Sequence, residues 1–514
     1  MRPIDLFYRA ARMAPQALAV AGSVSKLAPD GKLSYAELEH HAQALAAALQ
    51  KLGGKPRPVV ALLTENNPEM LVAILAIYAC QGVLVPLTSK YPAAEIHKQI
   101  ATAQPDVIVA SPKLAGVVRD LSTRVVWTAM SEDAREGDAC LGNLLREWDG
   151  RVPAETAYDA ADVAAIKFTG GSSGQPKAVL QSARCLVTMA VSMQQVFGLS
   201  DDDRFLLAPP MTHGAGTFVL PLLMAGGSLI IADGPKADVL LDLMHAHDAT
   251  GTWVPPTLLY RMLDAQEAVP RALPRLRHLL YGGAGIAPDR LAQAQSLFGP
   301  VVGVCYGQTE APVIISGMAG AEAAQDHARG SVGRAAPLTR LAIMAADGAL
   351  LPPGEEGEVV ARGDLLMSGY MSMPDATRET LKDGWLHTGD LGYLSPQGYL
   401  FLKGRLKEVI ISGGFNVYPS DVEAALSEHA AVAESCVFGL PDPLWGERVE
   451  AAVELKQEAC ATEEELIGFL KERIGAVRTP KRIHLFESLP RSALGKIQKR
   501  ELREGLMSAA KRTG

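Results

Sequence analysis

The sequence is poor in several features that mark whole classes of protein. Aromatic residues make up only 5% of the 514 residues, and none of the six cysteines forms a C-x-x-C pair. Scattered thiols argue against a disulfide scaffold or a zinc knuckle and favour a reducing, cytoplasmic compartment. Lys and Arg number 49 against 57 Asp and Glu, for a formal net charge of −8. The overall basic field that nucleic acid or an anionic membrane would require is therefore missing, and no nucleic-acid partner is expected.

Long apolar segments are also scarce. Charged residues such as Asp5 and Arg9 occur where a secretory signal needs an unbroken apolar run. The longest apolar run, Met70–Leu87, is divided by Gln81 and Gly82 into a helix-like part and a strand-like part. No integral membrane segment is therefore expected. With 48% hydrophobic and 21% charged residues, the composition is that of an ordinary folded protein.

Helix and strand patterns alternate along most of the chain. Ser34 and Glu37 form a capping box before a helix expected over 35–52. A short apolar run follows, and then Asn67 and Pro68 open a second helix. The apolar strand that comes after this helix completes a β-α-β unit, which requires parallel pairing. Further short apolar runs near 105–111, 228–233, 249–256 and 277–283 predict more strands of the same kind.

The pattern changes near residue 404. Beyond it, shorter strands alternate with two helices, one with a capping box at Ser420 and Glu423 and one capped by Thr462. The sequence therefore predicts an α/β fold in two domains. A large N-terminal body of several subdomains with mostly parallel sheets occupies 1–403, and a small, mobile α+β C-terminal domain occupies 404–514.

A Gly- and Ser-rich loop follows one predicted strand. Its chemistry-bearing residues are Thr169, Gly170, Gly171, Ser172, Ser173, Gly174 and Lys177. Glycines let backbone N–H groups converge on an anion, the hydroxyls add donors and the lysine adds charge, so the loop predicts phosphate binding. A Walker A loop is excluded, because two residues separate the last glycine from the lysine. A flexible surface loop is the alternative.

A second motif, Tyr306–Glu310, follows the apolar run ending at Cys305. A hydroxyl and a carboxylate on adjacent residues, Thr309 and Glu310, can hold a phosphate and a divalent cation, because Mg²⁺ prefers oxygen ligands shared with substrate phosphates. Tyr306 offers a flat ring to a purine. A polar turn without function is the alternative for this segment.

Three further segments carry candidate residues. Asp390 lies in a Gly-flanked turn suited to a ribose diol, although an Asx turn would look the same. Arg405 and Lys407 lie where the small domain begins. Lys496 follows Gly495 in a basic stretch, which taken alone is more typical of a solvated face.

The order and spacing of these five motifs resemble the adenylate-forming superfamily. It contains acyl-CoA synthetases, adenylation domains of nonribosomal peptide synthetases, and luciferases. The resemblance covers nearly the whole chain. It implies an AMP-forming acid–CoA ligase: a carboxylic acid and ATP give acyl-AMP and pyrophosphate, and the acyl group then passes to coenzyme A. ATP, Mg²⁺ and CoA are the implied cofactors, and a homodimer is left open.

The resemblance also implies roles at matching positions. The phosphate loop is the Gly- and Ser-rich loop above. Further nucleotide contacts are implied for Gly282, Gly283, Ala284, Tyr306, Gly307, Thr309, Asp390 and Arg405. Thr309 touches the α-phosphate, Glu310 holds Mg²⁺, and Lys496 is the lysine of the adenylation step. These three form the implied catalytic set.

The second half-reaction has its own implied positions. Lys407 stands at the hinge between the two domains, and Gly413 and Gly414 match the segment on the CoA side. Some residues depart from the family pattern. Gly170 replaces the usual Ser of the loop, and Ala178 replaces its final Gly. Because the Ser172 and Ser173 hydroxyls remain, phosphate binding is expected to survive.

The segment 209–216 resembles the one beside the acyl pocket. Met211, His213 and Gly214 are the pocket candidates, with a structural role for His213 as the alternative. Small residues at 214–216 are expected to leave room for a ring or an alkyl chain, and no aspartate is present to bind an amino group. The acid is therefore expected to be apolar, fatty or aromatic. Two other functions stay open: a free-standing adenylation enzyme that loads a carrier-protein phosphopantetheine, and a decayed, non-catalytic nucleotide-binding relative.

Overall fold

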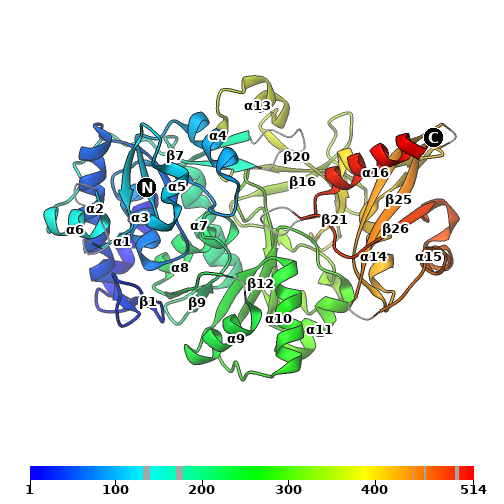
Figure 1. Ribbon diagram of the computed structural model, residues 1–514, viewed down its shortest axis with the longest axis horizontal. Coiled ribbons are helices and arrows are strands. Elements are labelled where there is room, and N and C mark those ends of the chain that lie inside the picture. Colours follow the sequence, from blue (N-terminus) through cyan, green and yellow to red (C-terminus); the bar gives the residue numbers. More distant parts are fainter. Residues whose placement is uncertain are drawn as a thin grey trace. The chain divides into compact units, whose positions relative to one another are not determined.

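The computed structural model describes residues 1–130, 139–169, 177–234, 236–443, 445–456, 459–491 and 497–513. The chain forms two compact units (Figure 1). The large unit comprises Met1–Gly285, Gln293–Leu341 and Ala361–His387, and the small unit comprises Ile286–Ala292, Ala342–Val360 and Thr388–Gly514. The predicted domain boundary at 403/404, with its hinge near Lys407, stays a prediction.

A seven-stranded sheet in the large unit has the order β18-β8-β7-β4-β3-β5-β6. Strands β4, β3, β5, β6 and β7 pair in parallel, β8 pairs antiparallel with β7, and β18 pairs antiparallel with β8 at the edge of the sheet. The strands are β3 (Val59–Leu63), β4 (Val83–Pro86), β5 (Val107–Ala110), β6 (Arg124–Trp127), β7 (Val163–Thr169), β8 (Lys177–Ser182) and β18 (Gly369–Tyr370). The helices nearby in sequence are α2 (Tyr35–Gly53), α3 (Pro68–Ala79), α4 (Ala93–Ala103), α5 (Ala115–Val118), α6 (Leu141–Glu147) and α7 (Ala183–Phe197).

A nine-stranded sheet, also in the large unit, has the order β15-β14-β13-β12-β11-β9-β10-β1-β2. Its strands are β1 (Leu18–Ala21), β2 (Lys32–Ser34), β9 (Arg204–Leu207), β10 (Ser228–Ile231), β11 (Gly251–Val254), β12 (His278–Gly282), β13 (Val302–Tyr306), β14 (Ser316–Met318) and β15 (Arg334–Ala335). The run from β1 to β13 is parallel. Its helices are α1 (Pro3–Met13), α8 (Val219–Ala225), α9 (Ala237–Ala246), α10 (Pro256–Ala268), α11 (Pro288–Phe298) and α12 (Gly320–Ala323).

A five-stranded sheet follows in sequence, with the order β16-β17-β20-β19 and with β21 on β20. Its strands are β16 (Arg340–Met344), β17 (Gly357–Arg362), β19 (Leu381–Lys382), β20 (Trp385–Leu394) and β21 (Leu400–Arg405), and α13 (Pro374–Thr380) precedes β19.

The last sheet belongs to the small unit. Strands β22 (Ile410–Ser412), β23 (Phe415–Val417), β24 (Val432–Asp442) and β25 (Gly446–Leu455) are antiparallel, and β26 (Arg482–Phe486) joins β25 in parallel. The helices are α14 (Pro419–Ser427), α15 (Glu463–Arg478) and α16 (Lys499–Thr513). Buried aliphatic residues of α14 and α15, such as Val422 and Leu466, share one core with the sheet.

Local sequence signals explain several of these elements. The Ser34 hydroxyl accepts from the Glu37 N–H at 3.2 Å and the Glu37 carboxylate accepts from the Ser34 N–H at 2.8 Å, so the predicted capping box begins α2. Asn67 caps α3 through the Met70 N–H at 2.7 Å. Helix α3 is buried on every side, which explains why its sequence lacks a polar face.

The capping box predicted at Ser420 is wrong. Helix α14 begins one residue earlier at Pro419, which favours the first helical position, and its N-cap is Tyr418 without a side-chain cap. Ser420 therefore lies inside the helix, where its hydroxyl donates instead to the Lys403 carbonyl oxygen.

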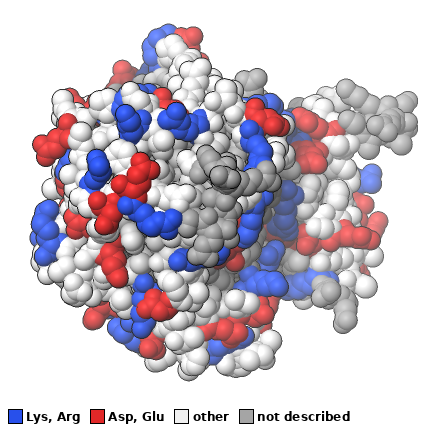
Figure 2. All heavy atoms as spheres, turned by 60° about the vertical axis from the view of Figure 1, so that its left-hand side comes forward, with Lys and Arg blue, Asp and Glu red and all other residues white. Residues whose placement is uncertain are grey.

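The described residues bear on two expectations, the absence of a membrane span and of a large basic surface. Among them, no helix has both the length and the apolar character needed to cross a bilayer, since the apolar run after Met70 is α3 followed by β4. Acidic and basic side chains are interspersed on the face shown in Figure 2.

Candidate active site

The two ends of the Gly- and Ser-rich loop lie side by side. Thr169 ends β7 and Lys177 begins β8, and the two residues are paired in the antiparallel ladder. The loop between them, 170–176, lies outside the described residues, and with it the predicted phosphate-loop residues Gly170, Gly171, Ser172, Ser173 and Gly174. The strand pair thus fixes where the loop leaves and re-enters the sheet.

Tyr370 connects this loop to the second motif. The Lys177 ammonium nitrogen lies 4.5 Å from the centroid of the Tyr370 ring, a cation–π contact. The Tyr370 hydroxyl donates to Glu310 Oε1 at 2.7 Å. Strand β18 pairs with β8, which places Tyr370 opposite Val179. Residues from three distant parts of the chain therefore meet at one place in the large unit.

The surroundings of the Tyr370 hydroxyl keep it protonated, so it can donate a hydrogen bond to Glu310. Burial raises the pKa of Tyr370, and the Glu310 carboxylate raises it further. The phenol is consequently neutral at physiological pH and holds one carboxylate oxygen of Glu310. Sequence reasoning missed this residue, because a two-residue strand carries no periodicity and Tyr370 lies far from both motifs in the chain.

The backbone of the second motif is held in place from β8. The buried Gln181 side-chain amide donates to the Thr309 carbonyl oxygen at 2.8 Å, and the Met367 N–H donates to the Glu310 carbonyl oxygen at 2.8 Å. At Gly307 a Cβ would lie 2.9 Å from the Val313 backbone, so this turn has no space for a side chain. Thr309 and Glu310 are therefore fixed just beyond the end of β13.

The predicted adenine segment lies on the neighbouring strand. Gly282 ends β12 and pairs with Cys305 of β13, one residue before Tyr306. Carboxyl ends of neighbouring parallel strands share one edge of a sheet, where ligands of open α/β sheets bind. A Cβ on Gly282 would lie 2.7 Å from the Cys305 carbonyl oxygen, and Gly283 has a φ of +84°. Gly283 thus adopts a backbone conformation that favours glycine.

Asp390 and Arg405 meet in the small unit. They are opposite each other on β20 and β21, and Arg405 Nε lies 2.7 Å from Asp390 Oδ1. The Asp390 side chain is 9% exposed and the Arg405 side chain 52% exposed. The sequence-predicted pair is therefore an ion pair in the structure, with the guanidinium open to solvent.

The residues around Glu310 fit a magnesium ion that is shared with substrate. No group of three or more His, Cys, Asp or Glu side chains suitable for a metal occurs among the described residues. Glu310 would therefore supply a single carboxylate, with phosphate oxygens and water completing the shell, which is the usual arrangement for Mg²⁺. The Tyr370 hydrogen bond orients that carboxylate, as outer partners of metal ligands commonly do.

The predicted acyl segment surrounds the start of the short 3₁₀ helix η3 (Gly214–Phe218). His213 Nδ1 lies 3.0 Å from the Thr212 hydroxyl, and its ring meets the Tyr91 ring edge-on at 6.3 Å between centroids. A Cβ at Gly214 would lie 2.3 Å from the Trp253 ring. The missing side chain at Gly214 therefore makes room for the Trp253 ring and not for the acid. The expectation that Gly214 leaves space for a ring or an alkyl chain of the substrate is thus wrong. Free space lies instead beside Met211.

The remaining predicted residues belong to the small unit. Lys407 is exposed within η5 (Leu406–Glu408). Gly413 and Gly414 form the turn between β22 and β23 with φ values of +58° and +83°. Lys496 lies outside the described residues.

Comparison with known proteins decides the family. Residues 7–371 match the model described as AMP-binding enzyme, and residues 421–496 match that of the AMP-binding enzyme C-terminal domain. The chain belongs to the AMP-binding enzyme family. A medium/long-chain-fatty-acid–CoA ligase of Mycobacterium tuberculosis is 32% identical over 94% of this chain and 87% of its own length. An indoleacetate–CoA ligase of Aromatoleum aromaticum is 33% identical over 93% and 94%.

Solved structures show the same fold. The amide bond synthetase McbA from Marinactinospora thermotolerans superposes with a TM-score of 0.87 at 27% identity, covering 98% of this chain and 99% of that one. The o-succinylbenzoate CoA synthetase of Bacillus subtilis, in complex with its acyl-adenylate, has a TM-score of 0.84 at 25% identity, covering 97% of both chains.

These comparisons confirm the family, the mixed α/β fold with a smaller C-terminal domain, and the enzyme class. The family member described here is an AMP-forming acid–CoA ligase, which uses ATP and CoA. The carrier-protein alternative is not favoured, because these curated relatives are CoA ligases.

Proposed function

We propose that this ligase activates an apolar carboxylic acid, fatty or aromatic, and transfers its acyl group to CoA. The observation that carries the proposal is the contact of Lys177 and Glu310 with the same tyrosine, which brings the phosphate-loop strand and the 306–310 motif together. The relatives support the acid class, since their names specify medium/long-chain fatty acids, indoleacetate and, for a synthase of Amycolatopsis, ferulate.

In the first half-reaction, a carboxylate oxygen of the acid attacks the α-phosphorus of ATP and the bond to pyrophosphate breaks. Negative charge accumulates on the non-bridging oxygens, so positioned cations and donors supply most of the catalysis. We assign the phosphates to Thr169–Lys177 and Thr309, with Lys496 at the transferred group. Mg²⁺ held by Glu310 would neutralise further phosphate charge when bound.

The base and ribose have separate sites in this proposal. Tyr306 stacks on the adenine, and the Gly282–Ala284 segment lines its edge at the same end of the sheet. Asp390 accepts hydrogen bonds from the ribose hydroxyls, and Arg405 holds the aspartate in place through their ion pair.

In the second half-reaction, the CoA sulfur attacks the acyl carbonyl carbon. The bond to AMP breaks, AMP leaves with the electron pair, and the thiol proton passes to solvent. We assign the CoA side to Gly413 and Gly414, whose turn has no side chains of its own. The exposed Phe415 ring, 60% accessible, follows directly.

Replacing Glu310 with glutamine should raise the Mg²⁺ concentration for half-maximal AMP formation by about tenfold or more, because a neutral amide is a poorer cation ligand. Tyr370→Phe should give a smaller shift in the same direction, since it removes only the orienting hydrogen bond. Titration of AMP release with Mg²⁺ measures both. The exposed Glu379→Gln in α13 is the matched control. An unchanged titration in Glu310→Gln would remove Glu310 from the metal site.

The acid class is tested with a panel of benzoates, linear acids from C2 to C16 and dicarboxylates. AMP release is measured with CoA present, and again with a carrier protein in its place. Acids with a long apolar chain or an aromatic ring should give higher rates than short acids such as the C2 acid, and free CoA should suffice. Activity only with the carrier protein would overturn the choice of CoA as acceptor.

A cytoplasmic location also belongs to the proposal. All six cysteines are free thiols and five of them are buried, which suits a reducing compartment. The homodimer stays a prediction.

A further inference from the structure

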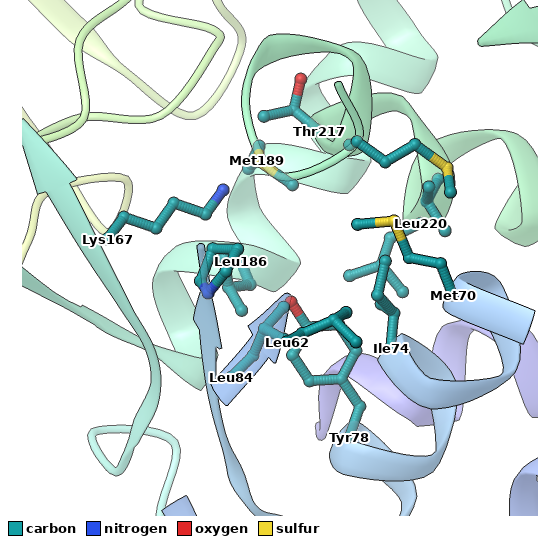
Figure 3. A pocket seen from close by; sticks show the side chains of 14 residues that line it. Leu62, Met70, Ile74, Tyr78, Leu84, Lys167, Leu186, Met189, Thr217 and Leu220 are labelled. Carbon is teal, nitrogen blue, oxygen red and sulfur yellow. The ribbon is translucent and has the colours of Figure 1, made fainter. Parts of the chain in front are cut away.

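A lysine lines a cavity whose other walls are mostly apolar. Lys167 lies on β7, and its neighbours Ile166 and Phe168 pack on the opposite face of the sheet, against the core that includes α4. Lys167 therefore points toward α3, α7 and α8, where a cavity of about 20 Å³ is bounded by side chains such as Leu62, Ile74 and Leu186. Figure 3 shows its amine directed into this cavity.

Within the described part of the chain, the Lys167 ammonium has no anionic partner. No hydrogen bond or ion pair to Lys167 occurs among the described residues. The polar groups that face the region are the Tyr78 hydroxyl from α3, the Cys185 thiol from α7 and the Thr217 hydroxyl from η3. Burial raises the pKa of Tyr78 and raises that of Cys185 to about 12, so both stay protonated and neutral. Burial likewise lowers the pKa of Lys167.

The cavity adjoins both halves of the proposed site. Thr169, where the phosphate loop begins, lies two residues beyond Lys167 on β7. Met211 and Gly216, which flank His213 in the acyl segment, belong to the cavity wall. Lys167 therefore lies between the strand that leads to the phosphates and the segment that we assign to the acid.

The walls can adapt to a ligand. Met70, Met189 and Met211 contribute to the lining, and methionine side chains change shape at little cost. The cavity already has room for one water-sized group beside the ammonium. Lys167 is half-buried, and an ammonium without an anionic partner beside apolar walls costs free energy. Charged groups in such surroundings gather at functional sites, so a ligand accounts for the presence of Lys167 better than packing does.

We propose that Lys167 is a specificity-determining residue that binds an oxygen acceptor, carbonyl or carboxylate, on the far part of the acid. The preferred substrate is then an otherwise apolar acid that carries a second oxygen function. This inference rests on the proposed function and narrows its substrate class. The ammonium donates a charge-assisted hydrogen bond to that oxygen, and no covalent step at Lys167 is involved.

The test compares acids of one chain length: octanoic acid, 7-oxooctanoic acid and octanedioic acid. The kcat/KM for AMP release is measured with CoA present, in the wild type and in Lys167→Met, which keeps an unbranched apolar side chain. The wild type should prefer at least one oxygen-bearing acid over octanoic acid. In Lys167→Met that preference should fall by about tenfold or more, the value of one charge-assisted hydrogen bond. The oxo and dicarboxylic arms separate carbonyl from carboxylate recognition.

Lys51→Met, the same substitution at an exposed position of α2, is the control and should leave the preference as in the wild type. A wild type that favours octanoic acid over both other acids overturns the inference, without any variant. So does a preference in Lys167→Met that stays within about threefold of the wild type. If Lys167→Met does not fold, Lys167→Gln is measured in its place. A wild type that releases no AMP with any acid in the larger panel instead contradicts the proposed function.

Lys167→Met should also raise the melting temperature at pH 7 by a few degrees, because it removes an uncompensated cation. The native pKa of Lys167 is lowered, so between that value and the unfolded value of 10.5 the unfolded state binds more protons. The stability of the wild type therefore rises with pH in that window, and the difference between the two proteins should shrink toward pH 10. Thermal unfolding of both proteins between pH 7 and pH 10 measures this difference in melting temperature. A variant that melts below the wild type at pH 7 would mean that Lys167 stabilises the fold.

Discussion

Replacing Lys496 with alanine should lower acid-dependent exchange of pyrophosphate into ATP by about 10²-fold or more. The reaction brings two anions together, and charge develops on the α-phosphate in the transition state. A positioned ammonium stabilises that charge more than it stabilises the bound substrates. Its loss therefore lowers the rate of the adenylation step. The assignment comes from the match of Lys496 to the family position.

The loss should be confined to one half of the reaction. Thioester formation from supplied acyl-AMP needs no new charge on phosphorus, so Lys496→Ala should reduce it far less than the exchange. Rapid-quench measurement of acyl-CoA from acyl-AMP and CoA gives this rate. Lys471→Ala removes an exposed lysine on α15 and should change neither rate. Equal losses in both halves would refute the assigned role.

Replacing Lys407 with proline should block CoA transfer by about 10²-fold while sparing pyrophosphate exchange, if the small domain must turn between the two half-reactions. The structure fixes the chain on both sides of this residue. Arg405 is held by Asp390, and the Glu408 carboxylate lies 2.9 Å from the Lys499 ammonium. A turn of the chain at Lys407 needs a free φ angle there, and proline locks that angle at about −65°.

Lys407→Ala is the matched control, because it removes the same side chain and leaves φ free. It should retain CoA transfer to within a few fold. The measurements are pyrophosphate exchange and single-turnover transfer from preformed acyl-AMP. Normal turnover in Lys407→Pro would count against domain alternation. Equal losses in the alanine and proline variants would place the effect in the side chain instead of the backbone.

The sequence predicts those parts of the fold that depend on neighbours in the chain. The capping boxes at Ser34 and Thr462 begin α2 and α15 as expected, and the short apolar runs become β3, β5, β10, β11 and β12. The order of the five motifs was sufficient to identify the family. Where two local signals compete, the sequence does not show which of them starts the helix: α14 begins at Pro419, so Ser420 cannot cap it.

Contacts between distant segments could not be predicted. Tyr370 reaches Glu310 only because β18 pairs with β8, and neither strand pairing nor a two-residue strand leaves a pattern in one sequence. The surroundings of Lys167 could not be predicted from the sequence either. A lysine between Ile166 and Phe168 in a strand looks like a solvent-facing position, and only the packing of α3, α7 and α8 on that face places it beside a mostly apolar cavity. Trp253 likewise fills the space that Gly214 seemed to leave.

The identity of the nucleotide product tests the central claim most directly. Purified protein is incubated with ATP, Mg²⁺, CoA and the acid panel, and the phosphorus products are separated and quantified. Cleavage between the first and second phosphorus predicts AMP and pyrophosphate in equal amounts, formed only when an acid is present and matched by acyl-CoA. Formation of ADP and phosphate, or no pyrophosphate with any acid, would contradict it.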